Sequence, residues 1–201
     1  MKILPIVQLG DPVLRRRARQ IAPRELREPV TQELIEAMRE TMRDAPGVGL
    51  AAPQVGLSLQ LAVIEDAPAN LESLDPEERK AREREAVPFH VIVNPVLHVE
   101  DAGPAYFFEG CLSFTGFVAS VPRARAVRVE CLDERGESRV IRAHGWYARI
   151  LQHEIDHLNG IVYVDRMETR TLMSSEAYGS AWGDRSTEQI RAALESVRRA
   201  E

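Results

Sequence analysis

The pentapeptide HEIDH at residues 153–157 constrains this chain more than any other feature. In an α-helix, residues four apart lie on one face, so His153 and His157 can hold one metal ion between them. Glu154 then lies beside that ion as a candidate general base. The motif alone fits a metal site and an ordinary solvated helix face equally well, so its surroundings have to distinguish the two.

A helical wheel over residues 146–158 puts the motif on an apolar face. That face consists of Trp146, Ile150, His153 and His157, with Glu154 beside them. Three polar residues fall on the opposite side, which we expect to face solvent: Arg149, Gln152 and Asp156. Buried imidazole and carboxylate groups are costly unless they are paired or bind metal, so the wheel favours a metal site. Gly160 is expected to end the helix.

A tetrahedral metal site needs a third protein ligand, and the sequence offers several. The pattern HExxHxxGxxH has its glycine at Gly160, but Tyr163 stands where the third histidine would be. A glutamate on a later helix is a second route, with candidates Glu168, Glu176 and Glu188. An upstream ligand is better supported, because Cys111 in the segment EGCLS would complete a set of one thiolate and two imidazoles.

Composition narrows the class of protein. With 201 residues, 44% of them hydrophobic, the chain is long enough for a real core, and we expect one domain over residues 1–201. A net charge of −5 argues against a nucleic-acid-binding surface and against attraction to anionic membranes. No run approaches the roughly 18 apolar residues of a spanning helix, and no signal peptide is recognisable, so we expect a cytoplasmic protein.

Periodicity predicts the elements around the motif. Three segments rich in Val, Ile and Leu are predicted as strands: 59–65, 91–100 and 126–132. A turn cluster after the last of them predicts a hairpin over 126–143, with Cys131 on its buried face. Helical spacing predicts a helix over 29–43 and another in the C-terminal tail, 174–201. The charged, proline-containing stretch 66–88 is expected to be a surface excursion.

The glycine-rich segment GVGLAAPQVG at residues 47–56 precedes these elements. It lacks the lysine of a phosphate-binding loop and the spacing of a dinucleotide-binding loop, so a phosphate site is not favoured. Its glycines allow the backbone to approach a ligand closely, and Gln54 is the polar side chain that such a loop can present.

The segments GVGLAAPQVG, EGCLS and QHEIDH, in this order and at these separations, resemble peptide deformylase. The resemblance extends from QLGDPVLR at residues 8–15 to GWYARILQHEIDHLNGIVYVDRM at 145–167 and is closest to the mitochondrial-like subgroup of type 1 enzymes. Together with the elements above, it predicts one α+β domain. Short mixed or antiparallel sheets pack there around a central metal-binding helix, with an N-terminal and a C-terminal helix added.

The resemblance implies removal of the formyl group from N-formylmethionyl nascent peptides, with release of formate. It assigns one divalent ion to Cys111, His153 and His157. Fe²⁺ is the implied ion, and Zn²⁺, Ni²⁺ or Co²⁺ are other occupants of such a ligand set. Water bound to the ion attacks the formyl carbon with Glu154 as general base and acid. The Gln54 side chain and the Leu112 backbone N–H are implied donors to the oxyanion.

A methionine side chain also needs an apolar slot beside the ion. The candidate substrate-binding residues are Val48, Gly49, Gly110, Trp146 and Ile150. Arg123 and Asp156 match family positions, and we expect them to pair in support of the site. The resemblance further implies a transient ribosome contact through the C-terminal helix. The motif by itself leaves two rival interpretations open. One is a metallopeptidase that cuts internal amide bonds, and the other is a non-catalytic binding protein in which the ion only stabilises the fold.

Overall fold

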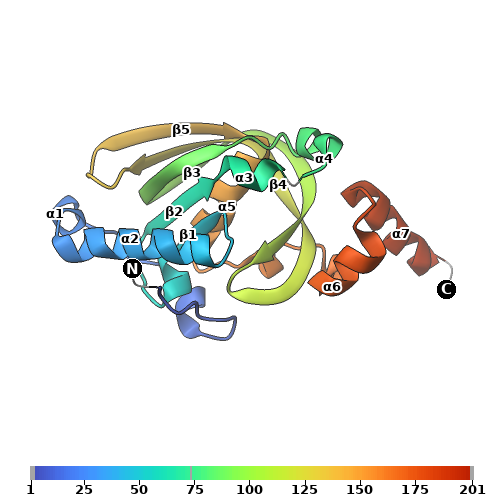
Figure 1. Ribbon diagram of the computed structural model, residues 1–201, viewed down its shortest axis with the longest axis horizontal. Helices are drawn as coiled ribbons and strands as arrows, with labels where there is room; N and C mark the ends of the chain where they lie inside the picture. Colours follow the sequence, from blue (N-terminus) through green and yellow to red (C-terminus); the bar gives the residue numbers. More distant parts are fainter. Residues whose placement is uncertain (1–2, 73, 200–201) are drawn as a thin grey trace.

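One antiparallel sheet forms the centre of the computed structural model, which describes residues 3–72 and 74–199 (Figure 1). Its first five strands lie in the order β1-β2-β3-β4-β5. They span Gly49–Ala51, Leu61–Asp66, Val87–Cys111, Phe114–Leu132 and Ser138–His144. The short strand β6, Met173–Ser174, pairs with β4 at Phe117 and Val118.

Two long helices, α2 (Pro29–Asp44) and α5 (Gly145–Leu158), cover the two sides of β2 and β3. On one side of β2 and β3, the odd-numbered residues of the two strands share a core with α2: Leu61, Val63, Val91 and Val93. The even-numbered residues share a core with α5: Ala62, Ile64 and Ile92. This is the two-residue alternation of strands, and it fixes α5 against the sheet through fully buried apolar side chains.

The helix predicted over 146–158 is α5, and the structure confirms both its extent and its end. Gly160 follows the helix with φ +75°, a conformation that favours glycine. A Cβ atom at this position would lie 2.8 Å from the backbone of Arg15. The close approach of the N-terminal segment therefore requires glycine at the point where the chain leaves the motif helix.

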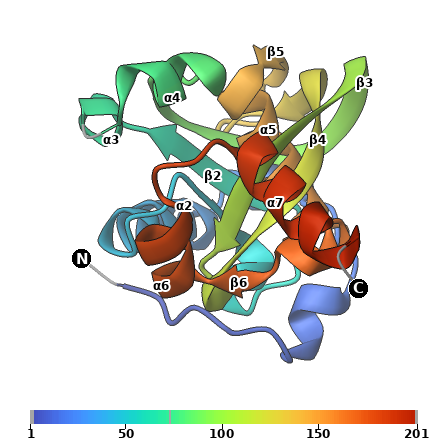
Figure 2. The same ribbon diagram turned by 90° about the vertical axis from the view of Figure 1, so that its right-hand side faces the viewer.

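Apart from the C-terminal helix α7, the other elements are short. Before β3 they are η1 (Pro12–Arg15), α1 (Pro23–Leu26), η2 (Ala52–Val55), α3 (Pro68–Glu72) and α4 (Pro76–Ala81). After α5 they are η3 (Tyr163–Asp165), η4 (Thr169–Thr171), α6 (Ser175–Ala177), the π-helical turn η5 (Tyr178–Trp182) and α7 (Thr187–Arg199). Figure 2 shows the tail elements β6, α6 and α7 together at one end of the molecule. None of the described helices is long and apolar enough to cross a membrane.

The α+β prediction is confirmed, as are the helix over 29–43, the strand over 59–65 and the 126–143 hairpin with Cys131 buried in the core. The strands β3 and β4 are much longer than predicted. Register shifts interrupt their pairing, between Val93 and Val96 and again between Asp101 and Pro104. Such irregularities interrupt the alternation of apolar and polar residues from which strands are predicted. The two strands nevertheless continue to the turn at the EGCLS segment.

The segment 66–88 differs from a plain surface excursion. It begins inside β2 and ends inside β3, and it carries the short helices α3 and α4 between them. Asp66 is fully buried, and Leu71 is 5% exposed. Residue 73 of this segment, and residues 200–201 of the predicted tail, lie outside the described residues.

Candidate metal centre

The helix α5 turns its motif side chains into the protein. The His153 side chain is 12% exposed, whereas His157 and Glu154 are 1% and 4% exposed. The two imidazole rings lie 5.0 Å apart between centroids, as expected for neighbours one turn apart on the same face. The sequence prediction that both histidines and Glu154 face inward is therefore confirmed by their burial.

Cys111 reaches the two histidines from the end of β3. Its Sγ lies 3.3 Å from His157 Nε2, and the three ligand atoms of Cys111, His153 and His157 all lie within 4.8 Å of one another. A tetrahedral ion with metal–sulfur and metal–nitrogen bonds of about 2.3 and 2.1 Å separates such ligands by roughly 3.6 Å. The donor set and its spacing therefore fit one divalent ion.

The glutamate routes to a third ligand are not seen in the described residues. Glu168 instead accepts hydrogen bonds from Arg191 Nε and Nη2, at 2.5 and 2.6 Å, and from Ser120 Oγ at 2.9 Å. Within residues 3–72 and 74–199, the group that can hold an ion is the upstream cysteine with the two histidines.

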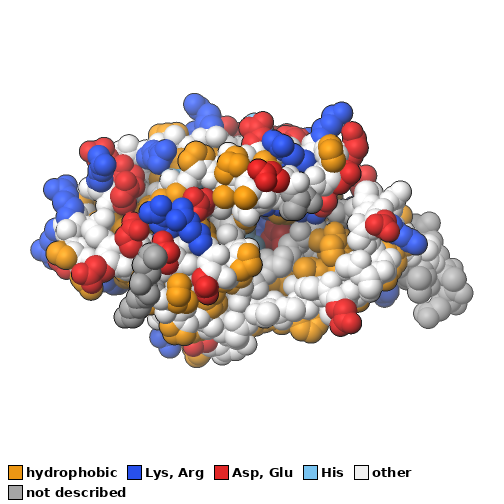
Figure 3. Space-filling view, in the orientation of Figure 1, with side chains coloured by type: hydrophobic (Ala, Val, Ile, Leu, Met, Phe, Trp, Pro, Cys, Tyr) orange, Lys and Arg blue, Asp and Glu red, His pale blue; other side chains and the backbone are white. Residues whose placement is uncertain are grey.

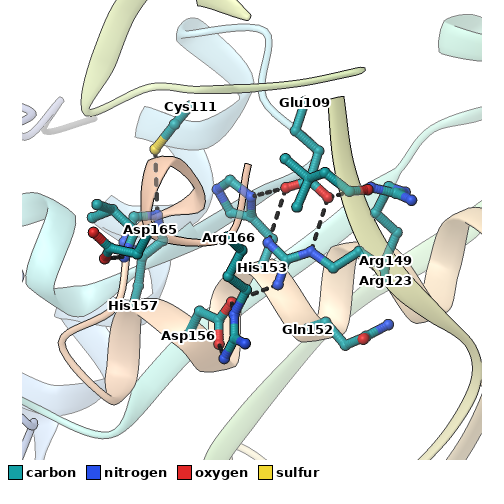
Figure 4. Close-up of polar contacts among 12 residues, drawn as sticks. Glu109, Cys111, Arg123, Arg149, Gln152, His153, Asp156, His157, Asp165 and Arg166 are labelled. Atoms are coloured by element: carbon teal, nitrogen blue, oxygen red, sulfur yellow. Dashed lines mark hydrogen bonds and ion pairs between the residues drawn. The ribbon is translucent and has the colours of Figure 1, made fainter. Parts of the chain in front are cut away.

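Glu109 orients His153 from β3. Its Oε2 lies 3.0 Å from His153 Nδ1, which leaves Nε2 of that ring to face Cys111 (Figure 4). Arg123 donates two hydrogen bonds to Glu109, both at 2.9 Å, and Arg149 Nη1 donates a third. Burial alone would raise the pKa of Glu109, yet Arg123 and His153 hold it well below its usual range. An ionised carboxylate thus fixes the ligand ring, as in many metal sites.

The polar side of α5 is not exposed to solvent, which corrects the wheel prediction. Arg149 is 3% and Asp156 7% exposed, and Gln152 is half-buried against β4, where it bonds the Ala124 backbone. The long strands β3 and β4 contact this side of the helix as well. A helical wheel shows which faces of a helix are polar. Whether other elements cover a polar face depends on the tertiary structure.

Asp156 is the centre of a second ion-pair group on this side. Arg123 Nη1 donates to Asp156 Oδ2 at 2.5 Å, and Arg166 adds two hydrogen bonds at 2.6 and 2.7 Å. Arg123 therefore bridges Glu109 and Asp156 and links the helix to the strand that orients His153. Figure 4 shows this chain of contacts, which runs from Glu109 through Arg123 to Asp156.

Glu154 points the other way, toward the glycine-rich segment. A Cβ atom at Gly49 would lie 2.3 Å from Glu154 Oε1, so a larger residue there would displace the Glu154 side chain. Oε2 has no hydrogen-bond partner among the described residues. Burial raises the pKa of Glu154 to about 7, which is favourable for a group that has to take and return a proton near neutral pH.

Gln54 completes the polar groups around the ligands. It is 2% exposed and lies in η2. The Ala51 backbone N–H donates to Gln54 Oε1 at 2.8 Å, and this fixes the amide with Nε2 toward the site, 3.6 Å from Cys111 Sγ.

An open cavity of about 410 Å³ leads from the surface to these groups. Its lining includes all five residues predicted to bind substrate, Val48, Gly49, Gly110, Trp146 and Ile150, and also Gln54, Cys111 and Leu112. Figure 3 shows a hollow on this face, between the segments that carry α4 and α6. The residues predicted from three separate motifs are thus brought together around one cavity.

Comparison with known proteins decides the family. The sequence model of the family described as polypeptide deformylase matches residues 3–172. The chain belongs to this family. It is 49% identical over 196 residues to peptide deformylase 3 of Streptomyces avermitilis, with 95% of this chain and 83% of that protein covered. It is 43% identical over 167 residues to the human mitochondrial peptide deformylase, with 83% and 69% covered.

Solved structures of the family agree. The chain resembles a peptide deformylase from Acinetobacter baumannii, crystallised with bound Met-Ala-Ser, with a TM-score of 0.72 and 32% identity. The match covers 82% of this chain and 98% of that one. The family match ends at residue 172, and therefore the tail elements β6, α6 and α7 lie beyond it.

Sequence reading missed two residues of this deformylase site. Glu109 stands two positions before Cys111, and the two-residue alternation of a strand could have placed both on one face. Arg149 was predicted to face solvent. Only its position next to Ile150 on the motif helix indicated that it could lie near the site. The deformylase pocket also contains Arg82 from the segment after α4 and Ser175 from α6, which no sequence motif indicated.

Proposed function

We propose that Cys111, His153 and His157 hold the ion with which this peptide deformylase, a hydrolase, removes the formyl group from N-formylmethionyl peptides. The observation that carries the proposal is the convergence of the three ligand atoms within 4.8 Å, beside a buried glutamate. We propose Fe²⁺ as the native ion, with Zn²⁺, Ni²⁺ and Co²⁺ as other occupants of the same ligands. Bound there, a divalent ion supplies the Lewis acidity that makes water a nucleophile near neutral pH.

Glu154 is the general base and acid of this proposal. Its carboxylate takes a proton from the attacking water as the water oxygen bonds to the formyl carbon. The C–N bond of the formamide then breaks and the same proton passes to the departing nitrogen. The second water proton leaves the formic acid for the amine, which gives formate and a free, protonated amino terminus. A divalent cation at Cys111, His153 and His157 would lower the pKa of Glu154 from this raised value, so that the carboxylate would be ionised near neutral pH.

Two donors face the formyl oxygen in this arrangement. The Gln54 amide is held with Nε2 toward the site because its oxygen is occupied by the Ala51 N–H. The Leu112 backbone N–H is the second proposed donor, since Leu112 lies on the cavity wall next to Cys111. Preorganised donors of this kind stabilise the negative charge that develops on the oxygen, and each commonly contributes about 10²- to 10³-fold.

The methionine side chain occupies the apolar part of the cavity. Val48, Trp146 and Ile150 form its walls, and the exposed backbone of Gly110 and the backbone of Gly49 are placed to pair with the peptide. The Acinetobacter structure with Met-Ala-Ser supports a peptide occupant of this kind. Arg123 and Asp156 act as structural support by holding Glu109 and α5 together.

Cellular context completes the proposal. We assign the enzyme to the cytoplasm, although the family also includes the human mitochondrial enzyme. We also assign it a transient contact with the ribosome through α7, and a single catalytic domain over residues 1–201. The ribosome contact follows from the use of nascent chains as substrate.

The test is formate release from formyl-Met-Ala-Ser by protein purified without oxygen and loaded with Fe²⁺. We expect rapid release by the wild type and none by Cys111→Ala, which loses the ion because one of its three ligands is gone. Cys131→Ala is the matched control, since that cysteine is buried in the core away from the site. Retention of metal and of activity by Cys111→Ala would overturn the proposal, as would an inactive wild type with the ion bound.

A further inference from the structure

A second cavity of about 270 Å³ lies next to the substrate cavity. Its walls come from the end of the excursion, from β3 and β4, and from the start of α7, and they include Phe107, Arg125, Gly145 and Ser186. Two side chains line both cavities, Arg82 and Arg149. These two arginines therefore separate the space that we assign to methionine from additional space behind it.

The two arginines are held very differently. Arg149 is 3% exposed and bonds Glu109, the Val121 carbonyl at 3.0 Å and the Ala105 carbonyl at 2.7 Å. It is a fixed part of the network behind the metal ligands. Arg82 touches none of these groups; its ion pair is with Glu78 in α4.

Arg82 lies instead across the aromatic wall of the pocket. Its guanidinium is 4.6 Å from the centroid of the Trp146 ring and 5.8 Å from that of Phe107. Its side chain is only 14% exposed, and Nε has no hydrogen-bond partner among the described residues. Tyr178 of the tail, which also interacts with Arg82, packs in a tilted arrangement on Phe108 of the pocket, with ring centroids 4.7 Å apart.

The backbone next to Arg82 is anchored on both sides. A Cβ atom at Gly145 would lie 2.4 Å from Glu83 Cβ and 3.0 Å from the Arg82 carbonyl oxygen, so the excursion rests directly on the start of α5. Arg84 donates two hydrogen bonds, at 2.7 and 3.0 Å, to the buried Asp66 at the end of β2. The position of Arg82 is thus set by the fold.

We propose that Arg82 is a specificity-determining residue, which closes the methionine pocket at its Trp146 wall, away from the metal ligands, and so limits the length of the first side chain of the substrate. The inference rests on the proposed function, because it concerns the same cavity. Because the Arg82 side chain lines both the 410 Å³ and the 270 Å³ cavity, we expect removal of its guanidinium to lengthen the first cavity toward the second. Each further methylene that enters it then contributes about fourfold to binding, from about 0.8 kcal/mol per buried CH₂.

The test uses a series of formyl-Xaa-Ala-Ser peptides in which Xaa is norleucine, 2-aminooctanoic acid or 2-aminodecanoic acid. The readout is the ratio of kcat/KM for the longest substrate to that for norleucine. We expect Arg82→Ala to raise this ratio at least about tenfold over the wild type. Arg82→Lys, which keeps the stem and the charge, is expected to stay near the wild-type ratio. Lys80→Ala is the matched control, because Lys80 is exposed on α4 and does not line the substrate cavity.

An unchanged ratio in Arg82→Ala overturns the inference, including the case in which activity on all three substrates falls in proportion. If Arg82→Ala does not fold, as judged by its thermal transition, Arg82→Gln replaces it and the same ratio decides. A wild type that releases formate from none of these peptides or from formyl-Met-Ala-Ser contradicts the proposed function instead. The two failures are therefore distinguishable.

Discussion

The inner and outer ends of the substrate cavity are built in different ways. At the inner end, Cys111, His153 and Glu109 come from motif segments and are held by buried hydrogen bonds and ion pairs. At the outer end, Arg82 and Tyr178 come from the excursion and the tail, and they are held by aromatic contacts and part-exposed polar groups. The expected catalytic chemistry therefore depends on rigidly held ligand residues, whereas residues of the excursion and the tail set the size of the substrate pocket.

The two ends of the cavity are therefore expected to differ in how much a substitution changes the stability of the protein. Removing one partner of a buried ion pair leaves an uncompensated charge and is strongly destabilising, whereas exposed pairs contribute little. Substitutions at the inner end are expected to act on metal, activity and folding. Substitutions at the outer end are expected to act on substrate choice and only slightly on stability.

The largest effect is expected for Glu154→Gln at the inner end. The amide keeps the shape of the side chain but cannot take the proton of the attacking water, so kcat is expected to fall by about 10²- to 10⁴-fold. The metal content, measured by elemental analysis, should stay that of the wild type, because Glu154 is not among the three ligands.

Glu176→Gln is the matched control for this change, since Glu176 is exposed on α6. It should leave kcat unaltered. If Glu154→Gln kept its activity with the ion bound, proton transfer would have to be assigned to another group.

The second effect concerns Glu109→Gln, which leaves Arg123 and Arg149 facing a neutral amide. We expect the free energy of unfolding to fall by about 3–5 kcal/mol, as for other broken buried pairs. Metal affinity is expected to fall by about 10- to 100-fold, because His153 loses the carboxylate that orients its ring. Urea unfolding of the metal-free protein and competition with a chelator measure the two quantities separately.

Glu130→Gln is the exposed counterpart, because Glu130 pairs with Arg128 and its side chain is 51% exposed. Its unfolding free energy should change by no more than about 0.5 kcal/mol. If Glu109→Gln and Glu130→Gln lowered the unfolding free energy equally, the expected difference between buried and exposed ion pairs would be contradicted.

The smallest effect is expected where the tail is attached, at Glu168→Gln. Glu168 bonds Arg191 of α7 and Ser120 of β4, and its side chain is 31% exposed. We expect a loss of about 0.5–1 kcal/mol in the unfolding free energy at pH 7. Burial raises the pKa of Glu168, but the hydrogen bonds from Arg191 and Ser120 outweigh it and the pKa is lowered from 4.5.

A lowered carboxylate pKa fixes the sign of the pH dependence. The contribution of Glu168 is complete above pH 4.5, the ordinary value, and disappears as the pH falls through the lower pKa of the folded state. The stability difference between wild type and Glu168→Gln, measured in urea from pH 7 to pH 3, should shrink below pH 4.5. A difference that stays constant over this range would contradict the assignment, and Glu188→Gln, at an exposed position of α7, is the control.

Much of the inner end could be predicted because it follows from local spacing. Residues four apart on a helix and a cysteine in a distinctive pentapeptide specify the ligands before any contact is known. The burial of Arg149 could not be predicted in this way. A helical wheel contains no information on whether a second layer covers the polar face, and here the long, irregular strands β3 and β4 do so.

The sequence by itself determined which side chains could meet a metal ion and on which face of α5 they lie, because helical periodicity is a local property of the chain. Only the tertiary structure decided that Glu109 orients His153, that Arg123 joins two buried carboxylates, and that Arg82 and the tail enclose the cavity. Each of these contacts joins residues far apart in the chain. Their proximity follows from how the strands pair and how the excursion packs on α5, which residue spacing does not encode.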